Sequence, residues 1–308
     1  MQDKFNSKGI FLSFAAAIIS GFAVFMNKFG VDLWQNSSIY TSAKNLTAAL
    51  FLVCAFLLFK KMPELSGLTK KTWMKLITIG IIGGSVPFLL FFRGLLLIPA
   101  TEAAFIQKTM FIWVAIFSYA LLKEKLGKIQ LAALAILSAG IYFLGAPAKW
   151  EFGTGAILVF AATLLWAAEN MTAKTVLKEI SSVTAALARM FFGALALLSY
   201  LFLTGEMSGL IESSFNQWKW AFITGAVLFA YVWCWYGALK YAPASVVSSI
   251  LVLAAPITAI IENLYSKGVF PTNIMLPIFI ISIGAILISG IFNNLKVHGL
   301  HAQIDPAK

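Results

Sequence analysis

Runs of apolar residues, each about 20 residues long, follow one another along this chain almost without a break. A run of about that length is what an α-helix needs to cross a bilayer, whereas the strands of a membrane barrel need only about 10 residues of alternating polarity. Charged residues make up 11% of the chain, against about 25% in an ordinary soluble domain. The sequence therefore predicts an all-α polytopic membrane protein of ten transmembrane helices. The predicted spans are residues 9–31, 38–59, 76–98, 101–122, 129–146, 154–173, 182–204, 218–239, 244–266 and 272–292.

Lysines are distributed unevenly between the loops that join these spans. In or beside every second loop, and at the two ends of the chain, are Lys4, Lys8, Lys60, Lys61, Lys70, Lys71, Lys75, Lys123, Lys125, Lys128, Lys174, Lys178, Lys240, Lys296 and Lys308. The opposite loops hold only Lys149, Lys219 and Lys267. Because cytoplasmic loops collect positive charge, this bias predicts a multi-pass protein of the inner or plasma membrane with both termini in the cytoplasm. The net charge of +11 then reflects topology and contact with the lipid bilayer. No nucleic-acid partner is expected, and a basic face for another partner is the alternative.

The chain also matches itself when it is shifted by roughly 145 residues. Residues 9–16 (GIFLSFAA) align with residues 155–162 (GAILVFAA), and the same register sets Lys28 against Lys174. Each half holds five predicted spans, an odd number, so the second half must enter the membrane from the opposite side. Inverted repeats of this kind are typical of transporters, and chance similarity between apolar segments is the alternative. The predicted domains are a first repeat at 9–146 and a second at 154–292, with short cytoplasmic tails at 1–8 and 293–308.

Two segments at corresponding places in the halves carry a family pattern. Pro99-Ala-Thr-Glu-Ala-Ala runs through Leu122-Lys-Glu124-Lys-Leu to Gly140, and Pro243-Ala-Ser-Val-Val runs through Ala255-Pro256 to Gly284. Together with a basic residue in the second and seventh spans, they resemble the drug/metabolite transporter superfamily, in its EamA branch. The resemblance covers nearly the whole chain. It implies that spans one, three, four, six, eight and nine line a central cavity, and it leaves the substrate open because members carry different metabolites.

Two positions depart from that family pattern. The family has a proline in the fourth helix as well as the ninth, but here Ile112 stands opposite Pro256, so the fourth span is expected to be the straighter of the two. Glu124, which follows the fourth span, has Gly268 as its counterpart. The predicted helix hinges are Pro87 and Pro256, because proline removes a backbone donor and interrupts a helix.

Several cations lie inside the predicted spans, where each costs about 2.5–3.5 kcal/mol unless it faces a wet cavity or a partner. Lys108 is roughly 10 Å below the outer end of its span, at about 1.5 Å per residue, and is the leading candidate for contact with a substrate. An ion pair with Glu262 or Glu102 is the alternative. The excess of cations over carboxylates, with aromatic residues nearby, predicts a cavity for an organic anion or zwitterion with an apolar part. The predicted substrate-binding residues are Lys108, Arg93, Glu102, Trp113, Trp166, Tyr231 and Trp235.

A second group of charged residues suits gating or coupling. Lys28 and Lys174 correspond between the halves, as do Lys44 and Arg189 after one residue of drift, which indicates a role in the scaffold or gate. Snorkelling to the headgroups or capping of helix carbonyls is the alternative. A bridge from Glu169 to Arg189 that holds an inner gate shut is favoured over a proton-coupling role for Glu169. The predicted coupling or gating residues are Glu169, Asn170, Arg189, Lys28, Lys44, Lys174 and Glu262.

No catalytic pattern accompanies these features. His298 and His301 both lie in the tail at 293–308, and the sequence has no P-loop, zinc motif or nucleophile elbow, so an enzyme, a metal and a cofactor are not expected. The sequence predicts a secondary transporter that exports a small organic metabolite by alternating access. An anionic or zwitterionic substrate is expected, with amino-acid-like molecules among the candidates. A passive channel, or an accessory or receptor subunit without transport of its own, is the alternative, and a homodimer is a possible assembly.

Overall fold

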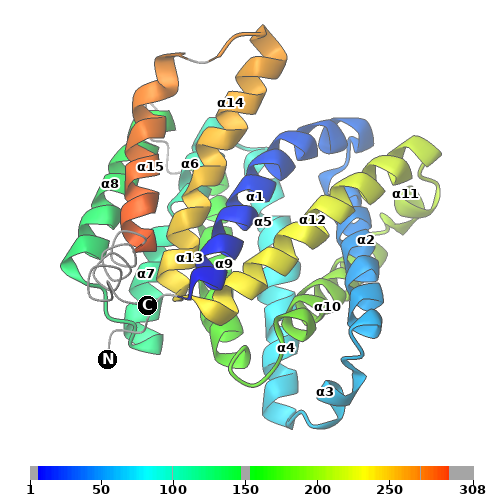
Figure 1. The fold of residues 1–308 in the computed structure, drawn as a ribbon. Coiled ribbons are helices and arrows are strands. Elements are labelled where there is room, and N and C mark those ends of the chain that lie inside the picture. Colours follow the sequence, from blue (N-terminus) through cyan, green and yellow to red (C-terminus); the bar gives the residue numbers. More distant parts are fainter. Residues whose placement is uncertain (1–5, 99, 147–152, 271, 291–308) are drawn as a thin grey trace, which may run out of the picture.

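The computed structural model describes residues 6–98, 100–146, 153–270 and 272–290, and these residues form helices and turns without any strand (Figure 1). The helices are α1 (Ser7–Trp34), α2 (Ser37–Leu58), α3 (Met62–Ser66), α4 (Lys70–Gly84), α5 (Val86–Leu95), α6 (Ala100–Lys108), α7 (Met110–Leu122), α8 (Lys128–Gly145), α9 (Thr154–Val176), α10 (Ser182–Leu203), α11 (Met207–Ile211), α12 (Phe215–Tyr241), α13 (Ala244–Ile250), η1 (Leu251–Leu253), α14 (Ala254–Lys267), η2 (Thr272–Ile274) and α15 (Met275–Ser289).

Within the described residues, nine helical segments are long and apolar enough to cross a membrane, and the shorter apolar helix α15 follows them. The predicted fold of many membrane helices is therefore confirmed. The third span begins earlier than predicted, at Lys70, because the Thr69 hydroxyl accepts the N–H of Thr72 (3.2 Å) and caps a polar first turn that hydropathy does not reveal. The predicted tail at 293–308 lies outside the described residues, as do residues 1–5, Lys149 and the last two residues of the tenth predicted span.

The third span is interrupted near its middle. α4 ends at Gly84 and α5 begins at Val86, with Ser85 between them in a non-helical conformation (φ −137°, ψ −73°). Pro87 lies in the first turn of α5, where the missing proline N–H costs nothing within that helix. The residue four positions before it, Gly83, consequently has a carbonyl that no helical N–H can reach. Whether Pro87 moves as a hinge stays a prediction.

The fourth span is interrupted although it has no proline, and whether it is straighter than the ninth stays a prediction. α6 and α7 are separated at Thr109, whose hydroxyl donates to the carbonyl of Ile106 (2.7 Å) and competes with the helical ladder. In the ninth span, η1 separates α13 from α14, and Pro256 lies in the first turn of α14. The register that sets Ile112 against Pro256 also sets Thr109 against Leu253, the last residue of η1. Both halves therefore interrupt this helix at the same place, one with a hydroxyl and one with a proline.

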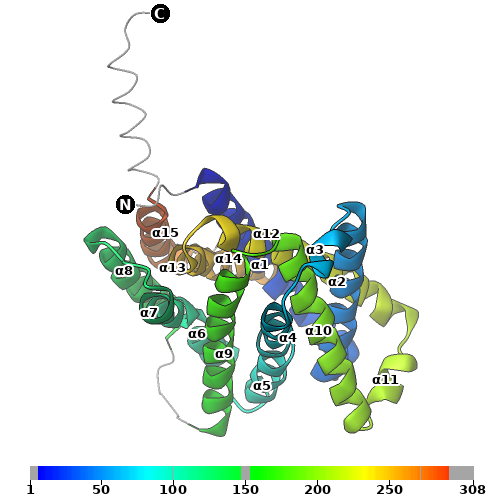
Figure 2. The same ribbon diagram turned by 90° about the horizontal axis from the view of Figure 1, so that it is seen from below.

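Helices from the two halves pack against each other throughout the bundle. α1 packs on α12 and α14, α8 packs on α15, and α9 and α10 each lie between helices of the first half (Figure 2). Glycine permits the closest of these approaches, because a Cβ on Gly193 of α10 would lie 2.8 Å from the Cα of Gly84 in α4. The two halves thus form one body, and a cavity where they meet is lined by both.

The two ends of α1 define the two sides of the bundle, which we call the Ser7 side and the Trp34 side. The loops that join α7 to α8, α9 to α10 and α12 to α13 lie on the Ser7 side, together with α3 (Figure 1). The loop that joins α14 to α15 lies on the Trp34 side, together with α11.

Candidate functional site

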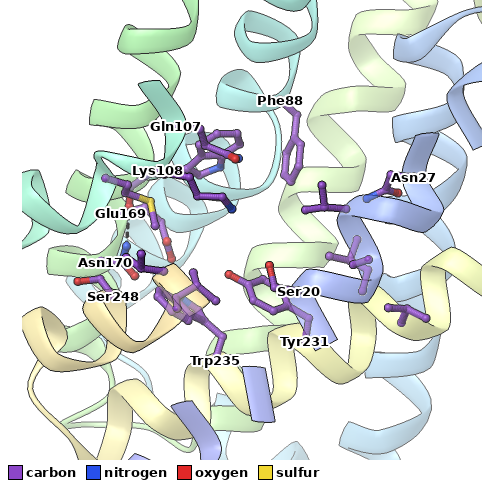
Figure 3. Close-up of a pocket in the computed structure, with 18 of the residues that line it drawn as sticks. Ser20, Asn27, Phe88, Gln107, Lys108, Glu169, Asn170, Tyr231, Trp235 and Ser248 are labelled. Carbon is purple, nitrogen blue, oxygen red and sulfur yellow. Dashed lines mark hydrogen bonds between the residues drawn. The ribbon is translucent and has the colours of Figure 1, made fainter. Parts of the chain in front are cut away.

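A cavity of about 170 Å³ lies where the two halves meet, smaller than the roughly 300–1,000 Å³ of pockets for drug-sized ligands. Its lining comes from α1, α2, α5, α6, α7, α9, α10, α12, α13 and η1 (Figure 3). Spans one, three, four, six, eight and nine, which the family resemblance implied, all contribute residues to the lining. The second span adds Lys44 and the seventh adds Arg189. Asn170, Trp235 and Ser248 lie at the end of the cavity nearest the Ser7 side, and each is only 2% exposed.

Two of the three cations in the cavity are held by neighbouring groups. Lys44 is 3% exposed, donates from Nζ to Oδ1 of Asn27 (3.1 Å), and lies over the rings of Tyr40 and Phe88. Such cation–π contacts favour a charge that is removed from water. Arg189 is 6% exposed and donates from Nη2 to the carbonyl of Gly83 (3.0 Å).

The site of Arg189 follows from the sequence of the third span. The carbonyl of Gly83 would normally accept the N–H of residue 87, but Pro87 has none. The freed carbonyl accepts from Arg189 and also from the indole N–H of Trp166 (3.2 Å). An interrupted helix thereby binds two side chains of the other half at the wall of the cavity, which is how membrane proteins satisfy exposed backbone groups.

Lys108 differs from the other two cations. It lines the cavity in the last turn of α6, and its side chain points into the open space (Figure 3). No hydrogen bond or ion pair holds Lys108 in the part of the chain that the structure describes, and the alternative pairs with Glu262 and Glu102 are not formed. Lys108 is therefore the cavity cation that is available to a bound molecule.

The acidic group of the cavity, Glu169, is 1% exposed and accepts a hydrogen bond from the hydroxyl of Tyr236. The predicted bridge from Glu169 to Arg189 is not among the ion pairs of the described residues, because Tyr236 and the Gly83 carbonyl bind these two groups instead. Both side chains nevertheless pack on Gly83, where an added Cβ would lie 2.6 Å from Cγ of Glu169 and 3.3 Å from Nε of Arg189. The two charges therefore attract each other across a short gap without direct contact.

On the Ser7 side, carboxylates bind across the boundary between the halves. Glu64, in α3, accepts from the backbone N–H and hydroxyl of Ser181 (2.7 Å from the hydroxyl) and from the hydroxyl of Thr184. These two residues form the start of α10. Burial tends to raise the pKa of Glu64, but these hydrogen bonds outweigh it and hold the pKa below its ordinary value.

Two further carboxylates repeat this arrangement. Glu179 accepts from the hydroxyl of Thr72 in α4 (2.7 Å) and lies 3.6 Å from Nζ of Lys75; the hydrogen bond first, and then the lysine, lower its pKa. Glu124 accepts from the N–H of Ala244 and from the hydroxyl of Ser245, both at 3.1 Å, at the start of α13. We call Glu64, Glu124 and Glu179 the carboxylate latch. Each binds near the N-terminus of a helix of the opposite half, where negative charge is favoured.

Comparison with known proteins identifies the family. A model of the EamA-like transporter family matches the chain over residues 7–146 and again over residues 153–290. The chain belongs to the EamA-like transporter family. It is therefore a multi-pass membrane transporter.

Two relatives of this EamA-like transporter are also named as transporters, and their names give no cargo. An uncharacterized transporter of Haemophilus influenzae is 31% identical over 144 residues, which are 44% of this chain and 46% of that protein. The matched region thus spans less than half of that relative. An uncharacterized transporter of Clostridium kluyveri is 23% identical over 219 residues, 68% of this chain and 69% of its own. A protein of known crystal structure, 17% identical, superposes with a TM-score of 0.74 over 94% of this chain and 99% of its own, which shows a shared fold.

The EamA-like transporter brings four of the predicted substrate-binding residues to its cavity: Lys108, Trp166, Tyr231 and Trp235. Arg93 does not line it. It follows the cavity-lining Phe88 by five residues, which at about 100° per residue turns it to another side of α5, and it is exposed.

Two other predicted residues also lie away from the cavity. Trp113 is five residues beyond Lys108 and past the interruption at Thr109, and it packs its ring against Phe160 (5.3 Å between centroids). Trp113 and Phe160 line an apolar hollow of about 390 Å³ between α6, α7 and α9. Glu102 is 5% exposed in the first turn of α6, and its Oε1 has no partner among the described residues.

Some of the predicted gating residues line the cavity and others lie away from it. Glu169, Asn170, Arg189 and Lys44 line the cavity. Lys28 and Glu262 instead pair with each other at 3.0 Å toward the Trp34 side, with side chains 63% and 49% exposed.

Lys174 caps the carbonyl end of a helix, which was the alternative to a role in the scaffold or gate. Its Nζ donates to the carbonyls of Leu239 and Ala242, both at 2.6 Å, at the end of α12.

Sequence reasoning missed the polar residues that complete the cavity. Asn27 and Gln107 line it, each next to a lysine that the sequence had singled out, and Ser20, Thr224 and Ser248 add hydroxyls. An amide inside an apolar span could have been noticed, because it also costs energy without a partner. The hydroxyls carried no such signal, since serine and threonine bond their own helix.

Proposed function

We propose that this protein is a secondary transporter that carries a small acidic or zwitterionic organic molecule, the cargo, through the cavity by alternating access. The observation that supports this best is the charge of the cavity. Lys44, Lys108 and Arg189 face a single carboxylate, Glu169, and Lys108 has no protein partner in the described residues. Lys108 is half-buried, and a cation without a partner inside a membrane is unfavourable, so a bound anion would complete the site.

The carboxylate latch supports the alternating part of the proposal. Its contacts join the two repeats, at 9–146 and 154–292, on the Ser7 side, and the buried end of the cavity faces that side. Toward the Trp34 side the halves are joined by the more exposed pair of Lys28 and Glu262. The lysine distribution predicts that the Ser7 side faces the cytoplasm. The conformation described here is then the one that is closed to the cytoplasm. Export would begin when the latch opens and the cargo enters the cavity from the cytoplasm. The membrane that the protein spans would be the inner or plasma membrane.

Thermal unfolding of the purified transporter tests the charge preference. Metabolites would be grouped as acids, zwitterions, amines and neutral molecules, and each group tested on the wild type, Lys108→Ala and Arg93→Ala. A ligand at about 100 times its dissociation constant adds about 2.7 kcal/mol of stability, which shifts the midpoint measurably. Arg93 is the matched control because it is also an intramembrane cation but lies outside the cavity.

We expect acids or zwitterions to raise the midpoint in the wild type and in Arg93→Ala, and to lose that effect in Lys108→Ala. Stabilisation by amines alone, unchanged in Lys108→Ala, would overturn the proposed cargo class and point to Glu169 as the binding group.

A further inference from the structure

Asn170 lines the cavity and carries a buried acceptor that no group of the described residues uses. The residue is 2% exposed, and its Nδ2 donates to the carbonyl of Trp166 (2.9 Å), one turn earlier in α9. Because a carbonyl can only accept, this bond fixes which end of the amide is which. Oδ1 is the other end of the amide, and no donor among the described residues reaches it. Buried polar atoms are normally hydrogen-bonded, so this atom needs an explanation.

Position separates Asn170 from similar atoms elsewhere. Asn45 shows the same pattern, since its Nδ2 donates to the carbonyl of Gly84 (3.0 Å) and its Oδ1 is buried without a partner. Asn45 does not line the cavity, whereas Asn170 does (Figure 3). Of the unpartnered buried side-chain atoms in the described residues, those in cavity-lining residues are Oδ1 of Asn170, an acceptor, and Nε of Arg189, a donor.

The remaining polar groups of the cavity leave few acceptors for a bound molecule. Lys108 and Arg189 can only donate. Oε1 of Glu169 is already bound by Tyr236, and the Ser248 hydroxyl donates to the carbonyl of Ser245 (3.1 Å). Gln107, Ser20 and Tyr231 also bring neutral acceptors to the cavity. Oδ1 of Asn170 differs from them because it is a buried side-chain atom without a partner among the described residues, so an N–H of the cargo would satisfy it.

The residue that corresponds to Asn170 in the first half of the chain has no acceptor in its side chain. The register that sets Lys28 against Lys174 sets Val24 against Asn170 and Ala23 against Glu169. Val24 and Ala23 also line the cavity. These two positions are thus polar in α9 and apolar in α1, between the polar residues Ser20 and Asn27 of α1, so an apolar part of the cargo would lie against Ala23 and Val24.

We propose that Asn170 is a specificity-determining residue whose Oδ1 accepts an N–H of the cargo. This inference rests on the proposed function. The transporter then prefers acids that also carry a nitrogen donor over plain acids of the same carbon skeleton. The acidic group binds at Lys108, the nitrogen donor at Asn170, and the apolar part lies against α1.

Matched pairs of ligands test this preference. The probes are alanine with propionate, valine with 3-methylbutanoate and leucine with 4-methylpentanoate, each pair differing only by the amino group. Dissociation constants would be measured by calorimetry on the full chain in nanodiscs. The wild type should bind at least one amino acid about tenfold or more tighter than its plain acid, the effect of one hydrogen bond to a charged donor.

Variants of Asn170 test whether this residue causes the difference in affinity between each amino acid and its plain acid. In Asn170→Leu, which keeps the size but loses the acceptor, the amino acid should bind no better than the plain acid, whose own affinity stays unchanged. Asn170→Asp keeps an acceptor and should retain the ratio, which also shows that substitution here allows folding. Asn45→Leu, the matched control, should leave the ratio unaltered.

A ratio that persists in Asn170→Leu would overturn the inference and leave Asn170 a structural residue, its Oδ1 satisfied by water. Plain acids that bind as well as amino acids in the wild type, with binding lost in Lys108→Ala, would also overturn it while the proposed function stands. Failure of every probe to bind the wild type would count against both.

Discussion

At the scale of single residues, the cavity is organised by which charged groups already have partners. Lys44 is held by Asn27 and Arg189 by the carbonyl of Gly83, whereas Lys108 is held by no described residue. Lys44 and Arg189 are buried and Lys108 is half-buried, so the three cations differ both in exposure and in their partners. Two of them stabilise the walls, and the third is free to bind what enters.

Gly83 is the residue on which the charged wall depends. In Gly83→Ala the new methyl group would lie 2.6 Å from Cγ of Glu169, a distance that real contacts do not show. Glu169 and Arg189 must then shift, so we expect a loss of about 1–3 kcal/mol in unfolding free energy, as in other overpacked sites, together with weaker cargo binding. Thermal unfolding and ligand binding of the purified variant measure both effects.

Gly67→Ala is the control for that substitution, because nothing lies within 4 Å of the added methyl group. It should change neither quantity. Equal behaviour of the two variants would show that the packing around Gly83 does not position the charges.

At the scale of helices, interruption of the spans creates the binding groups. Pro87 frees the carbonyl of Gly83 for Arg189 and Trp166, and the hydroxyl of Thr109 separates α6 from α7 directly after Lys108. The second half repeats the latter interruption at η1. Helices of this transporter are therefore irregular where they line the cavity, as expected of a membrane protein that must offer polar groups near its midplane.

Pro87→Ala tests the role of the freed carbonyl. Residue 87 would regain an N–H that competes with Arg189 for the Gly83 carbonyl. We expect cargo binding to weaken by up to about tenfold, the worth of one such hydrogen bond. The unfolding free energy should change by less than about 1 kcal/mol, because the gained bond offsets the lost rigidity.

Pro277→Ala is the matched control, since Pro277 also lies in the first turn of a helix but away from the cavity. Unchanged cargo binding in Pro87→Ala would contradict this account of the third span.

At the scale of the whole molecule, the two halves are joined by the carboxylate latch on the Ser7 side. The pKa values of Glu64 and Glu179 lie below their ordinary value of 4.5. A lowered carboxyl pKa stabilises the folded state fully above that ordinary value, and the contribution is lost as the pH falls through the pKa in the folded protein. The latch should therefore hold at neutral pH and loosen in acid below about pH 4.5.

Glu64→Gln tests the latch directly. We expect the variant to lose up to about 1 kcal/mol of stability at pH 7, since the carboxylate is partly solvated, and to lose less on acidification than the wild type does. Thermal midpoints measured from pH 7 to pH 3 show this difference. Glu262→Gln, a carboxylate toward the Trp34 side, is the control, and identical pH profiles for the wild type and Glu64→Gln would exclude a stabilising role for the latch.

Much of the fold followed from the sequence because membrane spans are set by hydropathy. The cations of the second and seventh spans, Lys44 and Arg189, line the cavity, and their role in gating or coupling stays a prediction. The interruption at Thr109 could not be foreseen, because a hydroxyl that bonds its own helix looks like any other threonine. Arg93 was misplaced relative to the cavity because depth along a helix does not give direction around it. Glu64 and Glu179 gave no signal as loop charges, since their partners are distant in sequence.

Solute counterflow in proteoliposomes tests the central claim most directly, namely that the cavity carries cargo by alternating access through Lys108. Vesicles loaded with an unlabelled ligand found by thermal unfolding would receive the labelled ligand outside, with the wild type, Arg93→Ala or Lys108→Ala in the membrane. Our account predicts saturable, transient accumulation of label with the wild type and Arg93→Ala, and its loss with Lys108→Ala. Label that enters without saturation or overshoot, equally with all three proteins, would contradict it and indicate a passive pore.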